Sequence, residues 1–413
     1  MAKDHREIWS FFTGAMGLDL GLEEAGLHPT LANEINPAFC RSIRANRPFL
    51  DLIEGDMREL SGTSLRARRQ FEGDVYLMAG GPPCQPFSSG GKRAALNDPR
   101  GNLIYEYLRL VHEVRPRYFA LENVANLTTA ALKHRRIQDR PGKRWSLKSY
   151  ETQRLPGFDG ESLPLDAEEM AGSALRQLLA DLRPLGYQIT FAVVDAADYG
   201  APQKRLRFIM MGARDYPPPS IPEASHGTGR APHVTVGEAI RHLVSAPGAH
   251  SEYTAPVAKM FRLVPPGGTW RDLPKEMHQE ALGGAYESGG GKTGFYRRLS
   301  WETPAPTITG RANRKGSAMC HPEATRPLSV LECAALQGFP PEWRFEGAMN
   351  TQYMQVGNAV PVALGRAIGS AVLAHEASAK KQPWKPDMDI MMAEAIGRLR
   401  AAGRNKRNQL IAA

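Results

Sequence analysis

Residues 74–89 read DVYLMAGGPPCQPFSS, an apolar run followed by a loop rich in glycine and proline. The run Asp74–Ala79 is short and apolar, which suits a buried strand. The two prolines that follow fix φ and remove two backbone donors, so the loop that carries Cys84 is stiff. A thiol displayed beyond the carboxyl end of a strand lies where open α/β sheets place their chemistry. A buried, inert thiol is the ordinary alternative for an intracellular cysteine, but the PPCQPFS context favours a reactive one.

Segments with strand and helix patterns alternate along the first 125 residues. The sequence predicts strands at Ile8–Phe12, Thr30–Glu34, Asp74–Ala79 and Arg117–Glu122, and helices at Gly17–Ala25, Pro37–Asn46 and Gly101–Val114. A further helix is predicted at Ser173–Arg183, with Ser173 as its N-cap, and two closing strands at Gln188–Asp195 and Arg205–Gly212. Strands alternating with helices predict an α/β fold with a doubly wound parallel sheet.

The composition is that of a globular protein with an excess of basic groups. The chain has 413 residues, of which 42% are hydrophobic and 23% charged, and its formal net charge is +9. Such an excess suits a polyanionic partner such as nucleic acid. No run of about 18 apolar residues occurs and no signal-peptide pattern begins the chain, so we expect a cytoplasmic protein without a membrane span. The four cysteines show no CxxC spacing, which argues against a metal site or a disulfide framework.

The loop around Cys84 resembles the nucleophile loop of the DNA (cytosine-5)-methyltransferases, in particular those of bacterial restriction-modification systems. Further motifs of that family follow in the family's order over residues 7–370. The matching segments are Phe12-Thr13-Gly14-Ala15-Met16-Gly17, Asn33-Glu34, Gly55-Asp56-Met57, Glu122-Asn123-Val124, Gln203-Lys204-Arg205-Leu206-Arg207, Arg326-Pro327-Leu328 through Gln337-Gly338-Phe339-Pro340, and Gln355-Val356-Gly357-Asn358-Ala359-Val360-Pro361. Each match alone is weak, but the ordered set is specific.

A thiolate that adds to carbon 6 of cytosine makes carbon 5 reactive toward a methyl donor. The resemblance implies that Cys84 is this catalytic nucleophile and that Glu122 holds a proton at cytosine N3. Arg205 and Arg207 alternate with Leu206, so on a strand both guanidinium groups would face one side and reach the base and a phosphate. We therefore expect both arginines to be catalytic as well. A salt-bridged glutamate and two surface arginines are the structural alternatives.

The glycine-rich loop Phe12–Gly17 follows a strand and opens a helix, which brings the backbone close to a nucleotide-like ligand. Alone it would equally suggest a nicotinamide cofactor, but no apparatus for hydride transfer occurs elsewhere. The resemblance implies S-adenosyl-L-methionine, and Met16, in place of a family glycine, predicts a reshaped methionine end of the pocket. The implied cofactor-binding residues are Phe12, Gly14, Gly17, Glu34, Ile35, Asp56, Met57, Pro83, Leu103, Asn358 and Ala359.

Composition and resemblance together divide the chain into four parts. Residues 1–212 are expected to form the Rossmann-like catalytic and cofactor-binding domain, with a basic insertion at about 130–165. The Pro- and Gly-rich residues 213–325 are expected to form a smaller, loop-rich target-recognition domain. Residues 326–375 return to complete the catalytic domain, and 376–413 form a basic C-terminal tail. The candidate DNA-binding residues are Gln85, Ser88, Arg297, Arg298, Arg311 and Arg314.

These inferences predict an enzyme that methylates a flipped-out cytosine in a specific double-stranded DNA site and protects host DNA. RNA cytosine-5 methylation on the same scaffold is one alternative. A catalytically silent DNA-binding paralogue is another, although the intact set of catalytic residues disfavours it. The expected partners are DNA and a cognate restriction endonuclease, and we expect a monomer on DNA at the nucleoid.

Overall fold

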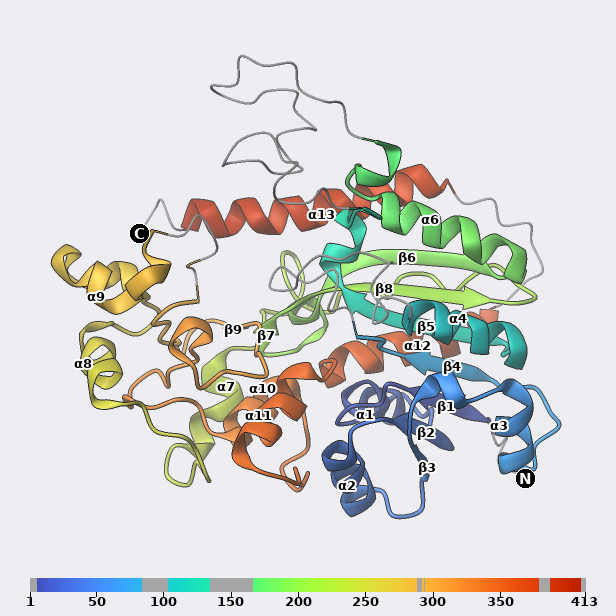
Figure 1. The fold of residues 1–413 in the computed structure, drawn as a ribbon, viewed down its shortest axis with the longest axis horizontal. Helices are drawn as coiled ribbons and strands as arrows, with labels where there is room; N and C mark the ends of the chain where they lie inside the picture. Colours follow the sequence, from blue (N-terminus) through green and yellow to red (C-terminus); the bar gives the residue numbers. More distant parts are fainter. Residues whose placement is uncertain are drawn as a thin grey trace.

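The computed structural model describes residues 6–83, 103–133, 166–287, 292, 294–378 and 387–409. A seven-stranded sheet with the order β3-β2-β1-β4-β5-β8-β6 forms its centre (Figure 1). Strands β1 to β5 are parallel, whereas β8 is antiparallel to both β5 and β6. The strands are β1 (Ile8–Phe11), β2 (Leu31–Glu34), β3 (Asp51–Glu54), β4 (Leu77–Gly80), β5 (Tyr118–Val124), β6 (Gln188–Asp195) and β8 (Leu206–Ala213). The predicted doubly wound α/β fold is confirmed.

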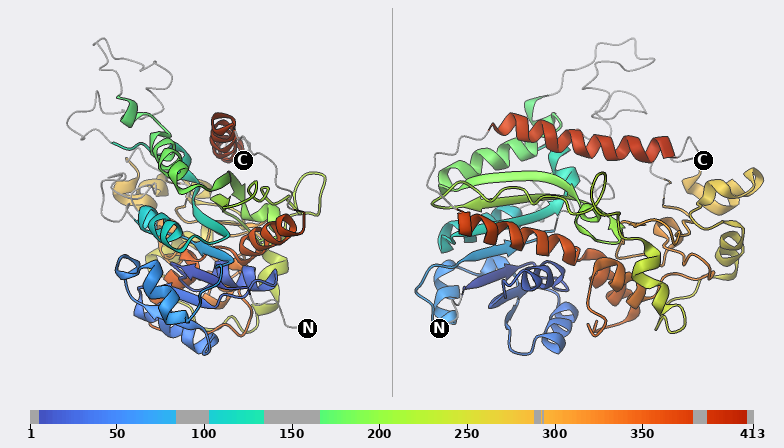
Figure 2. Two further views of the ribbon diagram at one scale, coloured as in Figure 1. Left: turned by 90° about the vertical axis from the view of Figure 1, so that its right-hand side faces the viewer. Right: turned by 180° about the vertical axis from the view of Figure 1, so that it is seen from behind.

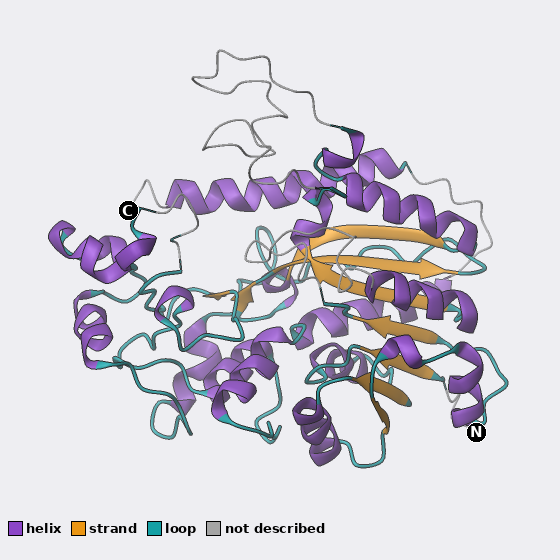
Figure 3. Ribbon diagram, viewed as in Figure 1, coloured by secondary structure: helices purple, strands orange, loops and turns teal. Residues whose placement is uncertain are grey.

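Two apolar cores cover the two faces of this sheet, and alternate residues of each central strand point into them. Trp9 and Phe11 of β1 face the core made with α3, α4 and α6, whereas Ile8 faces the core made with α1 and α12. Figure 2 shows these helices on opposite faces, and Figure 3 shows the strands between them. The helices of these layers are α1 (Gly17–Glu24), α3 (Gly62–Arg69), α4 (Leu103–Val114), α6 (Ser173–Leu182) and α12 (Val362–Ser378), while α2 (Pro37–Asn46) connects β2 to β3.

Two local predictions differ from the structure. The sequence analysis missed β3, which has only two apolar residues between Asp51 and Glu54 and is defined by its pairing with β2. Ser173 is the first residue of α6 and not its N-cap, which is Gly172 with a left-handed backbone at φ 88°. The Ser173 hydroxyl instead donates to the Glu168 carbonyl at 2.7 Å.

The strand order reverses between β1 and β4, which are neighbours in the sheet. From β1 the chain winds outward through β2 to β3, and from β4 it winds the other way to β5. Because Phe11 pairs with Gly80 at the ends of these two strands, the loops that follow them leave the sheet side by side. Open α/β sheets bind their ligands at such a reversal.

The chain after residue 325 packs back onto the first part of the sequence through α10 (Val330–Gln337), α11 (Met349–Asn358) and α12. Among the described residues, the stretch Met349–Ser378 is long and apolar enough to cross a membrane. However, residues 359–361 separate it into α11 and α12, and 61% of its most apolar window is buried within the protein. Its apolar character is that of a core element.

The C-terminal segment is more ordered than a tail. Helix α13 (Met388–Gln409) lies along β6 and the 3₁₀ helix η4 (Ala125–Thr129), as Figure 1 shows. Met392 and Ala395 are buried in the same core as α4 and α6. The prediction of a tail over 376–413 is therefore wrong for the part that forms α13, because apolar residues on one face of this helix pack against the core.

Residues 213–325 contain little regular structure. They hold α7 (Val236–Ile240), α8 (Ala255–Leu263), α9 (His278–Leu282) and the two-residue strand β9 (Ala305–Pro306), which pairs with β7 (Gln203–Lys204). A separate apolar core joins Phe261, Trp270 and Tyr296. Residues on either side of this core, such as Ile240 and Ile308, pack instead with α10 and α11.

Candidate active site

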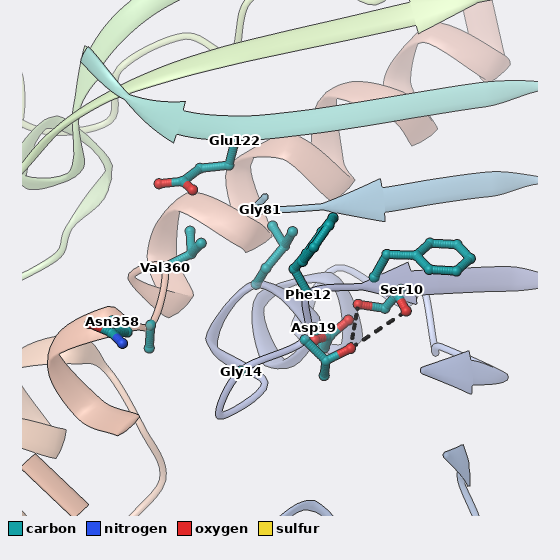
Figure 4. A pocket seen from close by; sticks show the side chains of 12 residues that line it. Ser10, Phe12, Gly14, Asp19, Gly81, Glu122, Asn358 and Val360 are labelled. Atoms are coloured by element: carbon teal, nitrogen blue, oxygen red, sulfur yellow. Dashed lines mark hydrogen bonds between the residues drawn. The ribbon is translucent and has the colours of Figure 1, made fainter. Parts of the chain in front are cut away.

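A pocket with a cavity of about 50 Å³ lies at the reversal of the strand order (Figure 4). Phe12 and Gly14 reach it from the loop after β1, and Gly81 reaches it from the loop after β4. Glu122 of β5 lines it as well, and residues 358–360 close it from the end of α11. The pocket thus brings together five residues expected at the site from separate motifs: Phe12, Gly14, Glu122, Asn358 and Ala359.

Left-handed backbone shapes the loop after β1, with φ of 55° at Phe12, 59° at Gly14 and 67° at Met16. A Cβ at Gly14 would have one neighbour, at 3.9 Å, so the loop leaves open space on the side where a ligand's atoms can approach. Met16 adopts the conformation that favours glycine, but its side chain is fully buried in the core with Leu20 and does not line the pocket. The expectation that Met16 reshapes the pocket is therefore wrong.

Gly17 has a packing role that the sequence analysis did not foresee. A Cβ at this position would lie 2.1 Å from the carbonyl oxygen of Val360. Glycine is needed there because the first turn of α1 meets the chain that returns after α11. Gly17 does not line the pocket itself, but it brings the two walls of the pocket together.

The expected ribose and adenine positions lie next to this loop. Glu34, at the end of β2, accepts hydrogen bonds at 2.8 Å from the backbone N–H groups of Gly14 and Asn36, and burial raises the pKa of its carboxyl. Gly55 donates its N–H to the Glu34 carbonyl at 3.1 Å, which holds the turn after β3 against β2. Asp56 in that turn accepts from the Arg58 guanidinium, with Nε at 2.9 Å from Oδ2.

Three other cofactor candidates lie at the margins of this region. Ile35 is 60% exposed beside Glu34, as an apolar platform for a planar ring would be. Met57 is buried. Leu103 begins α4, and Pro83 is exposed at the end of the described loop after β4. The open loop at Gly14 and the acid beside it fit the adenosine and amino-acid parts of S-adenosylmethionine.

Glu122 is held in a defined orientation. Its Oε1 accepts from Nε of Arg207 at 2.7 Å, and both side chains are nearly buried, with 10% and 13% of their areas exposed. The other oxygen, Oε2, would lie 3.3 Å from a Cβ at Gly81 and so faces the start of the Cys84 loop. Burial raises the pKa of Glu122, while the charges of Arg207 and Arg205 oppose this shift. The group can therefore hold a proton more readily than an exposed carboxyl.

The loop after β4 is tied to β5 by Asn123, whose Nδ2 donates to the Pro82 carbonyl at 3.2 Å. Cys84, Gln85 and Ser88 lie outside the described residues, as does most of the basic insertion. The other three cysteines are buried. Burial raises the pKa of Cys40 to about 12 and that of Cys320 to about 11, and it raises that of Cys333 as well. None of these three is a nucleophile at neutral pH.

The role expected for Arg205 is corrected by the structure. Its side chain is 3% exposed and donates to the carbonyl oxygens of Ile308 at 2.6 Å and Gly357 at 2.9 Å. A third bond, to the Ala359 carbonyl, is 3.1 Å long. Both terminal nitrogens are bonded to backbone carbonyls and the remaining Nε is buried, so the side chain offers no accessible group to a base or a phosphate. Arg205 joins three segments of the chain, and only Arg207 contacts the candidate acid through a hydrogen bond.

The candidate DNA-binding arginines divide in a similar way. Arg298 is 5% exposed and donates to the carbonyls of Val264 at 2.9 Å and Phe261 at 2.6 Å, so its assignment as a DNA contact is wrong. Arg297 is partly buried, which lowers its pKa. Arg311 and Arg314 are exposed and remain available to a partner.

Sequence reasoning missed several residues that line the pocket, above all Asp19 and Ser10. Asp19 lies in the first turn of α1, where an acidic residue is ordinary because it interacts with the helix dipole. Its position among the inward-facing leucines 18, 20 and 22 was the signal that could have revealed it.

Comparisons with known proteins show which family this chain is similar to. The family model of C-5 cytosine-specific DNA methylase matches residues 7–138 and 167–374. The chain is 36% identical over 379 residues to the Type II methyltransferase M.Eco47II of Escherichia coli, covering 89% of this chain and 78% of that protein. It is 33% identical to the Type II methyltransferase M.Sau96I of Staphylococcus aureus, covering 90% of this chain and 76% of that protein.

Among solved structures, the fold is similar to that of the Dnmt2 methyltransferase of S. pombe. The TM-score is 0.52 at 15% sequence identity, and the match covers 90% of this chain and 100% of the other. This likeness concerns the fold alone.

Proposed function

The chain belongs to the C-5 cytosine-specific DNA methylase family, and we propose that it methylates a flipped-out cytosine through a covalent bond between Cys84 and carbon 6 of the base. As a member of this family it is an S-adenosylmethionine-dependent DNA (cytosine-5)-methyltransferase. The observation that carries the proposed mechanism is the pair of Glu122 and Arg207, nearly buried beside Gly81 at the start of the Cys84 loop.

The two oxygens of Glu122 would have separate tasks. Oε1 is engaged by Arg207, which fixes the plane of the carboxyl. Oε2 faces Gly81 and would carry the proton that is shared with cytosine N3 when the thiolate attacks. Negative charge that develops on the ring is then neutralised without solvent, in a buried site where such an interaction is strong.

Cys84 is proposed as the nucleophile because the other three thiols are buried with raised pKa values. Addition of its thiolate to carbon 6 makes carbon 5 nucleophilic, and the bound cofactor supplies the methyl group from its sulfonium. A base then removes the proton from carbon 5, and the thiolate leaves carbon 6 to restore the ring. The target must leave the helix first, since the stacked duplex hides the faces of carbon 6.

Cofactor binding is assigned to the loop after β1 and the ends of β2 and β3. Glu34 would accept hydrogen bonds from the ribose hydroxyls, and Asp56 from the adenine amino group. Because a charge-assisted hydrogen bond is worth about 1.5–3 kcal/mol, Glu34→Ala should weaken cofactor binding roughly tenfold to a hundredfold. An unchanged calorimetric dissociation constant would remove Glu34 from the site.

Recognition of a specific duplex site is proposed for residues 213–325. Arg311 and Arg314 are exposed there. The loop that carries them contacts α11 closely, since a Cβ at Gly357 would lie 2.1 Å from the backbone N of Gly310. The names of the relatives motivate a role in host protection, with a cognate endonuclease as partner. We place the enzyme in the cytoplasm at the nucleoid, as a monomer on DNA.

Trapping with 5-fluorocytosine tests the covalent step. A duplex that carries this base at the target should form a denaturant-stable complex with the protein when cofactor is present, and Cys84→Ser should abolish it. Cys333→Ala, at a buried thiol, is the matched control and should keep the complex. Trapping by Cys84→Ser, or trapping of RNA in place of duplex DNA, would contradict the proposal.

Glu122→Gln separates the acid from the nucleophile. It keeps the hydrogen bond from Arg207 and removes the transferable proton, so methyl transfer should fall roughly 10²- to 10⁴-fold while cofactor binding stays unchanged. Turnover within threefold of the unaltered enzyme would exclude Glu122 as the acid.

A further inference from the structure

The buried carboxyl of Asp19 has no function in the chemistry derived so far. Asp19 lines the pocket from the first turn of α1 and is 0% exposed. Neither of its oxygens has a hydrogen bond of normal geometry to any residue that the structure describes. Ser10 is its polar neighbour and lowers its pKa, while the hydroxyl of Thr13 donates to that of Ser10 at 3.3 Å. No cation is among these neighbours, and a buried carboxyl that lacks one is costly, so a bound cation would stabilise its ionised form.

The place of Asp19 in the pocket restricts what that partner can be. Figure 4 shows Ser10 and Asp19 together at one end of the pocket and Glu122 toward the other. The methyl group and its sulfonium must lie toward Glu122, because the target base is held there. Glu34, which would hold the ribose, is not part of this lining and accepts a hydrogen bond from the Gly14 N–H. The end beside Asp19 is left for the amino-acid part of the cofactor.

We propose that Asp19 binds the α-ammonium group of the methionine part of S-adenosylmethionine. This assignment rests on the cofactor site described above and adds to it a residue outside the family motifs quoted for this chain. Asp19 and Glu122 are the charged residues among the described lining of the pocket, and both are acidic. S-adenosylmethionine has two cationic groups, the sulfonium and the α-ammonium. Since the sulfonium must face the target base near Glu122, the ammonium is the cation that can lie beside Asp19.

Electrostatics in the protein without ligand agree with this role. Burial raises the pKa of Asp19 to about 7, and the charge of Glu23 raises it further, whereas Ser10 lowers it. Glu23 is one turn along α1 and is paired at 2.6 Å with Arg47, the residue that follows α2, so this arginine neutralises Glu23 and not Asp19. A bound ammonium would supply the missing positive charge and stabilise the ionised carboxylate.

The experiment is a double-mutant cycle in which one change is made in the ligand. Calorimetry would measure the binding of S-adenosylhomocysteine and of its analogue with hydrogen in place of the α-amino group, to the unaltered protein and to Asp19→Asn. We expect the unaltered protein to bind the deaminated ligand roughly tenfold to a hundredfold more weakly. Asp19→Asn should bind S-adenosylhomocysteine with a similar loss and should no longer distinguish the two ligands.

One result would overturn the proposal. If Asp19→Asn discriminates between the two ligands by the same factor as the unaltered protein, Asp19 does not contact the ammonium, and any equal weakening of both ligands is a structural effect. Glu23→Gln is the matched control on the same helix and should keep the discrimination. If Asp19→Asn does not fold, Asp19→Ser provides the same cycle with a smaller side chain.

Failure of the cofactor site itself would look different. Glu34→Ala should weaken both ligands equally, because both contain the ribose. If Glu34→Ala has no effect on either ligand, the ribose assignment fails, whatever the result at Asp19.

Discussion

Replacing Asp19 by asparagine should change how the stability of the free protein depends on pH. The pKa of this carboxyl is raised from 3.8 to about 7 in the folded protein. Because the folded state holds the proton of Asp19 more tightly than the unfolded state, the contribution of this group to stability is greatest at low pH and is lost as pH rises from about 4 to about 7. The rise of this pKa from 3.8 to about 7 corresponds to about 4 kcal/mol of folding free energy, which is lost above pH 7.

The asparagine in Asp19→Asn cannot ionise, so the unfolding free energy of this variant should not fall as pH rises through 7 on account of position 19. Urea unfolding of both proteins at pH 5, 6, 7 and 8, without cofactor, gives the difference in unfolding free energy at each pH. The variant should gain about 3 kcal/mol on the unaltered protein between pH 5 and pH 8. The cost of burying the asparagine amide adds a constant, so the slope is the test. A difference that does not change with pH would refute the reasoning.

Two further predictions compare paired variants. Gly17→Ala should destabilise the protein by about 1–3 kcal/mol or more, because its Cβ would lie 2.1 Å from the Val360 carbonyl. Gly55→Ala, with nothing near its Cβ, should leave the melting temperature nearly unchanged, and equal effects would contradict the packing role. Arg298→Ala should lower the melting temperature because buried carbonyls lose their donor. Arg311→Ala should instead weaken DNA binding and, if it contacts a phosphate, reduce the log–log salt slope by about 0.9; an unchanged affinity would exclude that contact.

Local patterns predicted six of the seven strands of the central sheet, because the alternation of short apolar strands with helices is a local property. The site was expected beyond the carboxyl end of β4, whereas the order of the strands was not predicted. β3 was missed because Leu52 and Ile53 alone carry its pattern, and its edge position requires no more. The packing of α13 depends on a contact with β6 nearly 200 residues away in the sequence, and no local pattern records such a contact.

The roles of the arginines could not be predicted, because whether an arginine is buried depends on segments that are distant in the sequence. Arg205 and Arg207 are two positions apart and have the same chemistry, yet one lies among carbonyls from residues 308 to 359 and the other contacts Glu122. The acceptors of Arg298 are likewise supplied by distant backbone. Asp19 was overlooked because an acidic residue in the first turn of a helix is ordinary, and its position in α1 therefore gave no reason to expect a binding role.

The bonds of Arg205 have a consequence for how this protein could diversify. All three acceptors of its guanidinium are main-chain oxygens, one beside the loop at 309–314, which carries the exposed Arg311 and Arg314, and two beside the pocket. Every residue type has a carbonyl, so the anchor survives whatever side chains the neighbouring loop acquires. Side-chain substitutions in that loop should therefore leave the distance from loop to pocket unchanged. The side chains of the loop can therefore vary while Arg205 keeps the loop backbone attached to the backbone of the pocket.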